Sequence, residues 1–104
     1  VSFCPDIGWI RKTTPNVVDT LRIIEARIRI VHFKDYVADG LEVKDDETEF
    51  GRGILDFDEA FALLAQLPLD QLWIVAEQWK SSVNHLPPEA SIQANREFLS
   101  AFCQ

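Results

Sequence analysis

The sequence contains no methionine, one tyrosine and four glycines in 104 residues. No apolar run approaches the roughly 18 residues that a membrane-spanning helix requires, and no signal-peptide pattern opens the chain. We therefore expect no membrane partner. The length suits one domain around one core. Because the chain starts at Val1 in apparent strand sequence and has no methionine, we expect a piece of a longer protein.

Basic residues are scarcer than acidic ones, ten against seventeen, which gives a formal charge of −7. A surface of that sign repels phosphate backbones, so nucleic acid is not an expected partner. The two cysteines, Cys4 and Cys103, lie near opposite ends and lack the C-x-x-C spacing of metal and redox motifs. We expect both to be buried free thiols, which favours a cytoplasmic, reducing location.

Apolar runs typical of strands alternate with amphipathic segments typical of helices. We expect, in order, a strand over 1–4, a helix over 15–26, a strand over 28–33, a helix over 57–67, a strand over 72–76 and a helix from 87. The expected buried stripes are Val17, Val18, Leu21 and Ile24, then Phe57, Phe61, Leu64 and Leu67, then Ile92, Leu99 and Phe102. Three successive βα units predict an α/β fold with right-handed crossovers and a parallel sheet.

The segment 36–50 is polar and acidic, and we expect a solvated loop there, including Asp45-Asp46-Glu47. Gly51 and Gly53 close this loop. They either let the backbone pass close to a site or only reverse the chain. His85 lies beside two prolines and is expected at the surface.

Each predicted strand delivers a potential metal ligand at its carboxyl end, where active sites of parallel α/β folds lie. These residues are Asp6, His32 and Glu77. Taken singly, the aspartate could cap a turn and the histidine could be a hydrogen-bonded structural residue. Glu77 closes an almost wholly apolar strand, where a carboxylate is costly to bury without a partner. Residue parity also places His32 and Glu77 on strand faces that could look into a barrel.

Two carboxylates and an imidazole form an oxygen-rich ligand set. Such a set suits Mn²⁺, Mg²⁺, Co²⁺ or Zn²⁺ rather than copper or an iron–sulfur cluster. Of these, Mn²⁺ is the ion that we expect. With three protein ligands, coordination positions remain for water or substrate oxygens.

Four segments, in this order, make the sequence similar to a known family: CPDIGW, RIRIVHFKD, EFGRGILDF and LWIVAEQW. They resemble the sugar phosphate isomerase/epimerase group of the xylose isomerase-like TIM barrel superfamily. The resemblance implies that residues 1–104 are one partial TIM-barrel domain, the C-terminal three βα units of a (β/α)8 barrel. It also implies a small-molecule sugar or sugar phosphate as substrate.

The resemblance assigns Asp6, His32 and Glu77 as three of four metal ligands, the fourth being a glutamate upstream of Val1. It makes Glu77 the catalytic acid/base as well, acting next to a metal-bound carbonyl and hydroxyl pair.

Three further residues receive roles beside the ligands. Trp9 stands where some members carry a substrate-contacting histidine, so we expect an apolar wall for the substrate. Lys34 could reach a substrate oxygen or an internal carboxylate, or be solvated. Asp35 is expected to orient its neighbours behind the ligands.

Other functions remain open. AP endonucleases share the fold but need histidines where this chain has Trp9 and the stretch Glu47-Thr48-Glu49. Dehydratases of the same superfamily share the ligand pattern. A different class of function is a non-catalytic, truncated half-barrel that self-associates, because three βα units cannot close an eight-stranded barrel. We therefore expect either a homo-oligomer or a missing N-terminal half.

Overall fold

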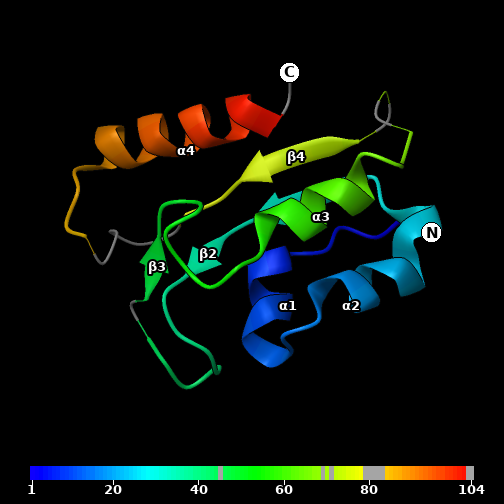
Figure 1. Ribbon diagram of the computed structural model, residues 1–104, viewed down its shortest axis with the longest axis horizontal. Coiled ribbons are helices and arrows are strands. Elements are labelled where there is room, and N and C mark those ends of the chain that lie inside the picture. Colours follow the sequence, from blue (N-terminus) through cyan, green and yellow to red (C-terminus); the bar gives the residue numbers. More distant parts are fainter. Residues whose placement is uncertain (45, 69, 71, 79–83, 103–104) are drawn as a thin grey trace.

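The computed structural model describes residues 1–44, 46–68, 70, 72–78 and 84–102 (Figure 1). Its elements are α1 (Ile7–Thr13), α2 (Val17–Ile24), the 3₁₀ turn η1 (Glu25–Arg27), β1 (Ile30–Phe33), β2 (Asp35–Tyr36), β3 (Glu47–Thr48), α3 (Phe57–Leu64), β4 (Trp73–Ala76) and α4 (Pro88–Phe102). None of the described helices is long and apolar enough to cross a membrane.

Strands β1 and β4 pair in parallel, with Ile30 opposite Trp73 and Phe33 opposite Ala76. The first residues run parallel to β1 on its other edge through two isolated bridges, Phe3 to Ile28 and Asp6 to His32. The predicted parallel α/β arrangement is therefore confirmed.

The prediction of a buried first strand is wrong. Val1 is 99% exposed, and Cys4 is exposed rather than a buried thiol. The isolated bridges of this segment do not build a continuous strand, and one side of it carries no packed layer. Cys103 lies outside the described residues.

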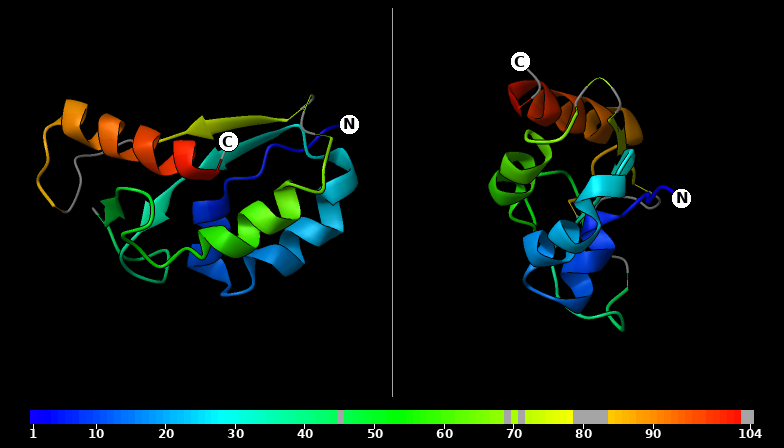
Figure 2. Two further views of the ribbon diagram at one scale, coloured as in Figure 1. Left: turned by 45° about the horizontal axis from the view of Figure 1, so that its top comes forward. Right: turned by 90° about the vertical axis from the view of Figure 1, so that its right-hand side faces the viewer.

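The two faces of the β1–β4 sheet differ sharply. Val31 and Phe33 are fully buried, whereas Ile30, Trp73 and Val75 are 37%, 72% and 38% exposed. Figure 2 shows α2 and α3 on one side of the strands, which explains the difference. The apolar core on that side contains Ile7, Val17, Leu21, Ile28, Val31, Phe33, Phe50, Leu55, Phe57, Ala60, Leu63 and Leu64.

The helices follow the sequence in part. α2 with η1 matches the expected helix over 15–26, although it begins after Asn16 instead of at Pro15. α3 begins where Asp56 accepts a hydrogen bond from the Glu59 backbone N–H at 3.1 Å. The sequence did not predict α1, which has only seven residues and no long apolar stripe.

The inward face of α4 is polar at Ser91 and Asn95 and apolar at Phe98 and Leu99, which corrects the expected stripe in part. Ile92 is 68% exposed, while Ser91 and Asn95 are 4% and 6% exposed. Ser91 Oγ donates to Glu49 Oε1 at 2.8 Å, and Asn95 Oδ1 accepts from the Phe50 backbone N–H at 2.9 Å. These bonds turn the polar side of the helix inward. Leu99 packs against the core, as predicted.

The segment expected to be a solvated loop contains the antiparallel pair β2–β3. Asp46 and Glu47 are 5% and 8% exposed, so the prediction of solvation is wrong for both, and Asp45 lies outside the described residues. A Cβ on Gly53 would lie 2.2 Å from the Tyr36 carbonyl oxygen. This glycine therefore allows the loop after β3 to pass close to the backbone of β2.

Candidate functional site

Three carboxyl ends of extended segments meet at one place. Asp6 bridges to His32, and His32 pairs with Val75, two residues before Glu77. His32 Nδ1 lies 2.8 Å from Glu77 Oε2. One ligand atom from each of Asp6, His32 and Glu77 lies within 4.8 Å of the other two. The structure thus brings together the three residues that the sequence proposed as ligands.

Backbone hydrogen bonds fix where these side chains start. The His32 N–H donates to the Pro5 carbonyl oxygen at 2.9 Å, and the Glu77 N–H donates to the Phe33 carbonyl oxygen at 3.0 Å. Asp6 caps α1, because its Oδ1 accepts from the Trp9 backbone N–H at 3.0 Å. The cap holds one carboxylate oxygen of Asp6 and orients the other.

Burial raises the pKa of Asp6 above its usual value. The Trp9 N–H bond and the positive charge of Lys34 oppose this effect, and the Glu77 carboxylate adds to it. Crowding of acidic groups at a partly buried site favours a bound cation, which would stabilise both carboxylates in their ionised form.

Lys34 is 4% exposed, so it is not solvated. Its Nζ lies 3.9 Å from Glu77 Oε2 and 3.9 Å from Glu47 Oε1. The ammonium therefore stands between a residue of the cluster and a residue of β3. Of the alternatives that the sequence left open, this geometry favours contact with internal carboxylates.

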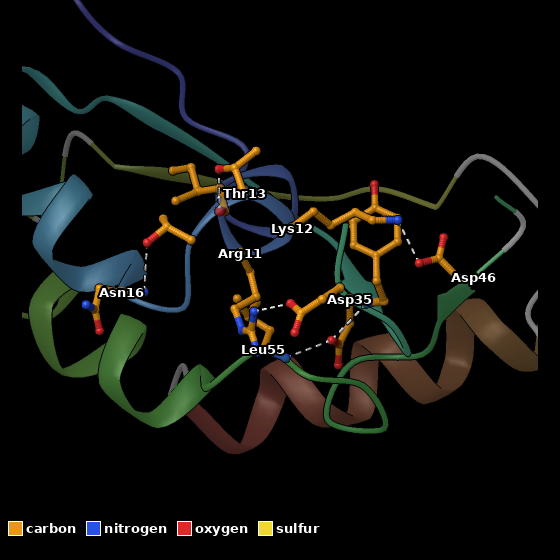
Figure 3. A network of polar contacts seen from close by, with 11 residues as sticks. Arg11, Lys12, Thr13, Asn16, Asp35, Asp46 and Leu55 are labelled. Atoms are coloured by element: carbon orange, nitrogen blue, oxygen red, sulfur yellow. Dashed lines mark hydrogen bonds and ion pairs between the residues drawn. The ribbon is translucent and has the colours of Figure 1, made fainter. Parts of the chain in front are cut away.

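Asp35 organises the loop between β3 and α3 through its carboxylate. Its Oδ1 accepts from the N–H groups of Tyr36 and Leu55 at 3.0 and 3.2 Å, and Figure 3 shows the bond to Leu55. Its Oδ2 accepts from Gly51 and Gly53 at 3.0 and 2.9 Å. Burial raises the pKa of Asp35, although these four donors oppose the shift.

Trp9 is 47% exposed and meets the Tyr36 ring edge-on, with 6.0 Å between the centroids. The sequence named Trp9 but missed Tyr36 and Glu47, which the hairpin places beside the cluster. The short alternation Glu47-Thr48-Glu49 is a weak strand signal that could have indicated β3.

The donor set fits a divalent ion. Two carboxylates and one imidazole are within reach of one another, and all three side chains are partly buried. Three such ligands leave coordination positions open, as catalytic metal sites require.

Comparison with known proteins agrees with this geometry. A family model described as xylose isomerase-like TIM barrel matches residues 1–102. No curated protein matches the chain.

Proposed function

The chain belongs to the xylose isomerase-like TIM barrel family, and from this premise we propose that it carries the site of a divalent-metal-dependent sugar or sugar phosphate isomerase/epimerase. The family includes sugar isomerases and epimerases and is often metal-dependent. The observation that carries the proposal is the convergence of Asp6, His32 and Glu77 at the carboxyl ends of parallel segments.

The proposal extends to the fold. The parallel segments are three adjacent strands of a (β/α)8 barrel, its C-terminal three βα units. The uncovered sheet face, with Ile30, Trp73 and Val75, is then the face that points into the barrel. Such a barrel presents its site at the edge where His32 and Glu77 lie.

Asp6, His32 and Glu77 would hold the ion, with Mn²⁺ as the first candidate. When bound, a divalent ion supplies positive charge to adjacent carbonyl and hydroxyl oxygens of the sugar. Glu77 removes the proton from the carbon next to the carbonyl, and the nearby Lys34 ammonium stabilises the ionised carboxylate that this step needs. Return of this proton by Glu77 to the former carbonyl carbon on the same face, with transfer of the adjacent hydroxyl proton to the former carbonyl oxygen, completes an isomerisation. Epimerisation requires a second acid on the opposite face.

The test uses the two histidines of the chain as a matched pair. His32→Asn removes the proposed ligand, and His85→Asn removes an exposed histidine whose φ of 55° asparagine tolerates. Mn²⁺ binding is followed by the loss of the free-ion electron paramagnetic resonance signal. We expect His32→Asn to weaken binding by at least about 100-fold, since loss of outer-shell partners alone costs about 10- to 100-fold.

Equal Mn²⁺ binding by both variants would reject the assignment of His32. In the wild type, Mg²⁺, Co²⁺ or Zn²⁺ that displaces bound Mn²⁺ restores the free-ion signal of Mn²⁺. This competition ranks the affinities of the site for these ions. Loss of binding in both variants, with both folded, would indicate adventitious surface coordination.

A second candidate function is a non-catalytic module that self-associates through the uncovered sheet face. The observation that favours it is the exposure of Trp73 beside Ile30 and Val75. A contiguous apolar patch of this kind is typical of a surface that binds another protein. A second copy of the chain is the occupant that we propose for it.

A further inference from the structure

The hairpin β2–β3 places an aromatic side chain beside the candidate site. Tyr36 lies directly opposite Glu47 in the antiparallel pair, so the two side chains project on the same face of the hairpin. Glu47 Oε1 lies 3.9 Å from Lys34 Nζ, which lies 3.9 Å from Glu77 Oε2. The face that carries Tyr36 is therefore the one that turns toward the cluster.

The ring of Tyr36 is held from two sides. Lys12 Nζ lies 4.3 Å from the ring centroid, and Trp9 meets the ring edge-on. Lys12 is itself fixed by Asp46, 2.6 Å from its Nζ, and Figure 3 shows this pair. A displaced ring would lose its contacts with both Lys12 and Trp9.

The hydroxyl of Tyr36 is buried and has no hydrogen-bond partner, and no other buried side-chain nitrogen or oxygen among the described residues is in this state. A buried hydroxyl without an acceptor is costly, and native proteins almost always satisfy such groups. Something outside the described side chains is therefore expected to accept this hydrogen bond.

The charges around the hydroxyl define its role. Burial raises the pKa of Tyr36, and the carboxylates of Asp6, Glu47, Asp46 and Glu77 raise it further. A phenol with a raised pKa keeps its proton at neutral pH and can donate a hydrogen bond. An acceptor oxygen next to the acidic cluster would satisfy this hydroxyl.

We propose that the Tyr36 hydroxyl is a ligand-positioning donor, which gives its hydrogen bond to an oxygen of a polyol or hydroxy-ketone seated against Asp6, His32 and Glu77. The proposal rests on the proposed function, because it needs a ligand of that class at the site. It adds a residue from β2 to a site otherwise built from strand ends. Hydroxyls and carbonyls of such a ligand all offer the acceptor that Tyr36 lacks.

The experiment compares two variants that each remove one buried hydroxyl while keeping shape. Tyr36→Phe removes the unpartnered group. Thr48→Val removes a hydroxyl that accepts from Asn84 Nδ2 at 3.2 Å and donates to Glu49 Oε2 at 3.3 Å. The thermal midpoint is measured on the ligand-free chains. Binding of the sugar alcohol xylitol to the Mn²⁺-loaded chains is measured by calorimetry.

We expect opposite results for the two variants. Tyr36→Phe should keep or raise the thermal midpoint, bind Mn²⁺ like the wild type, and bind xylitol about three- to tenfold more weakly. Thr48→Val should lower the midpoint and leave xylitol affinity unchanged. Because the chain has a single tyrosine, the ¹³Cζ resonance of labelled Tyr36 should also shift when xylitol is added with Mg²⁺.

Three outcomes would overturn the proposal. A lower midpoint for Tyr36→Phe with unchanged xylitol affinity would show that the hydroxyl serves the fold, through an internal water. Equal xylitol affinity of the wild type and Tyr36→Phe, with an unchanged thermal midpoint, would show that the hydroxyl contributes neither to binding nor to stability. Failure of the wild type to bind Mn²⁺ would reject the proposed function itself, and the metal titration reveals that result separately from the xylitol titration.

Discussion

Around the β2–β3 hairpin, charged side chains are buried, whereas the uncovered face of the β1–β4 sheet exposes apolar ones. The buried charged group comprises Lys12, Lys34, Asp35, Asp46, Glu47 and Glu49, each less than 10% exposed. The exposed apolar group comprises Ile30, Trp73 and Val75. Both regions reverse the usual distribution, but with different consequences.

A buried charge requires a partner inside the fold, because its desolvation is costly. Lys12 has Asp46, and Asp35 has four backbone donors. Exposed apolar side chains need no partner within the chain, and their surface area is available to bind another molecule. The charged region is therefore stabilised by contacts within the chain, whereas burial of the apolar face requires a binding partner.

The largest expected effect comes from breaking the pair Lys12–Asp46. Lys12→Met keeps the length of the side chain but leaves Asp46 buried and unpaired. We expect the free energy of unfolding, measured in urea, to fall by about 3 kcal/mol. The double variant Lys12→Met with Asp46→Asn should recover at least half of this loss, since it removes the orphaned charge.

The neighbouring residue supplies the control. Arg11→Met breaks a pair with Asp39 whose aspartate side chain is 66% exposed, and Figure 3 shows that Arg11 and Lys12 reach different partners from α1. We expect a loss of less than about 1 kcal/mol. Equal losses for the two variants would mean that burial does not distinguish the two pairs.

This contrast also explains what the sequence could reveal. The helices α2 and α3 and the strands β1 and β4 carry local periodicity, and their places were predicted. Asp6, His32 and Glu77 were predicted to be ligands because active sites of parallel folds lie at strand ends, and the structure brings the three residues together.

The polar elements were not predictable in the same way. Asp46 and Glu47 are buried by partners far away in sequence, Lys12 and Lys34, so nothing in their own segment distinguishes them from a solvated loop. The prediction that Ile92 of α4 is buried is wrong for the same reason, since Ser91 is buried instead by its bond to Glu49. A local sequence pattern indicates the burial of apolar side chains, but it does not indicate the burial of polar side chains through ion pairs or hydrogen bonds.

The apolar face offers the second prediction. Trp73→Lys places a charge where a second copy would dock, and it should change the free energy of unfolding of the isolated chain by no more than about 0.5 kcal/mol. If the wild type is a dimer by light scattering, the variant should be a monomer. Ile92→Lys is the matched control, because Ile92 is 68% exposed on α4 and is not part of the proposed docking surface. A wild type that stays monomeric at high concentration rejects self-association.

The smallest expected effect concerns Asp6, where the charged region meets the proposed ligand. Burial raises the pKa of Asp6 above 3.8, so the folded chain holds this proton to higher pH than the unfolded chain does. The contribution of this group to stability is full below pH 3.8 and is lost as the pH rises through the folded pKa. Asp6→Asn keeps a good helix cap but removes the titration.

Without metal, Asp6→Asn should therefore have a higher thermal midpoint than the wild type at pH 7 and the same midpoint near pH 3.5. Saturating Mn²⁺ should reverse the order at pH 7, because only the wild type gains stability from the bound ion. A higher midpoint at pH 7 that Mn²⁺ does not reverse would mean that the Asp6 carboxylate is a cap under strain and not a ligand. The reversal itself would show that the cost of burying this charge is offset by the metal.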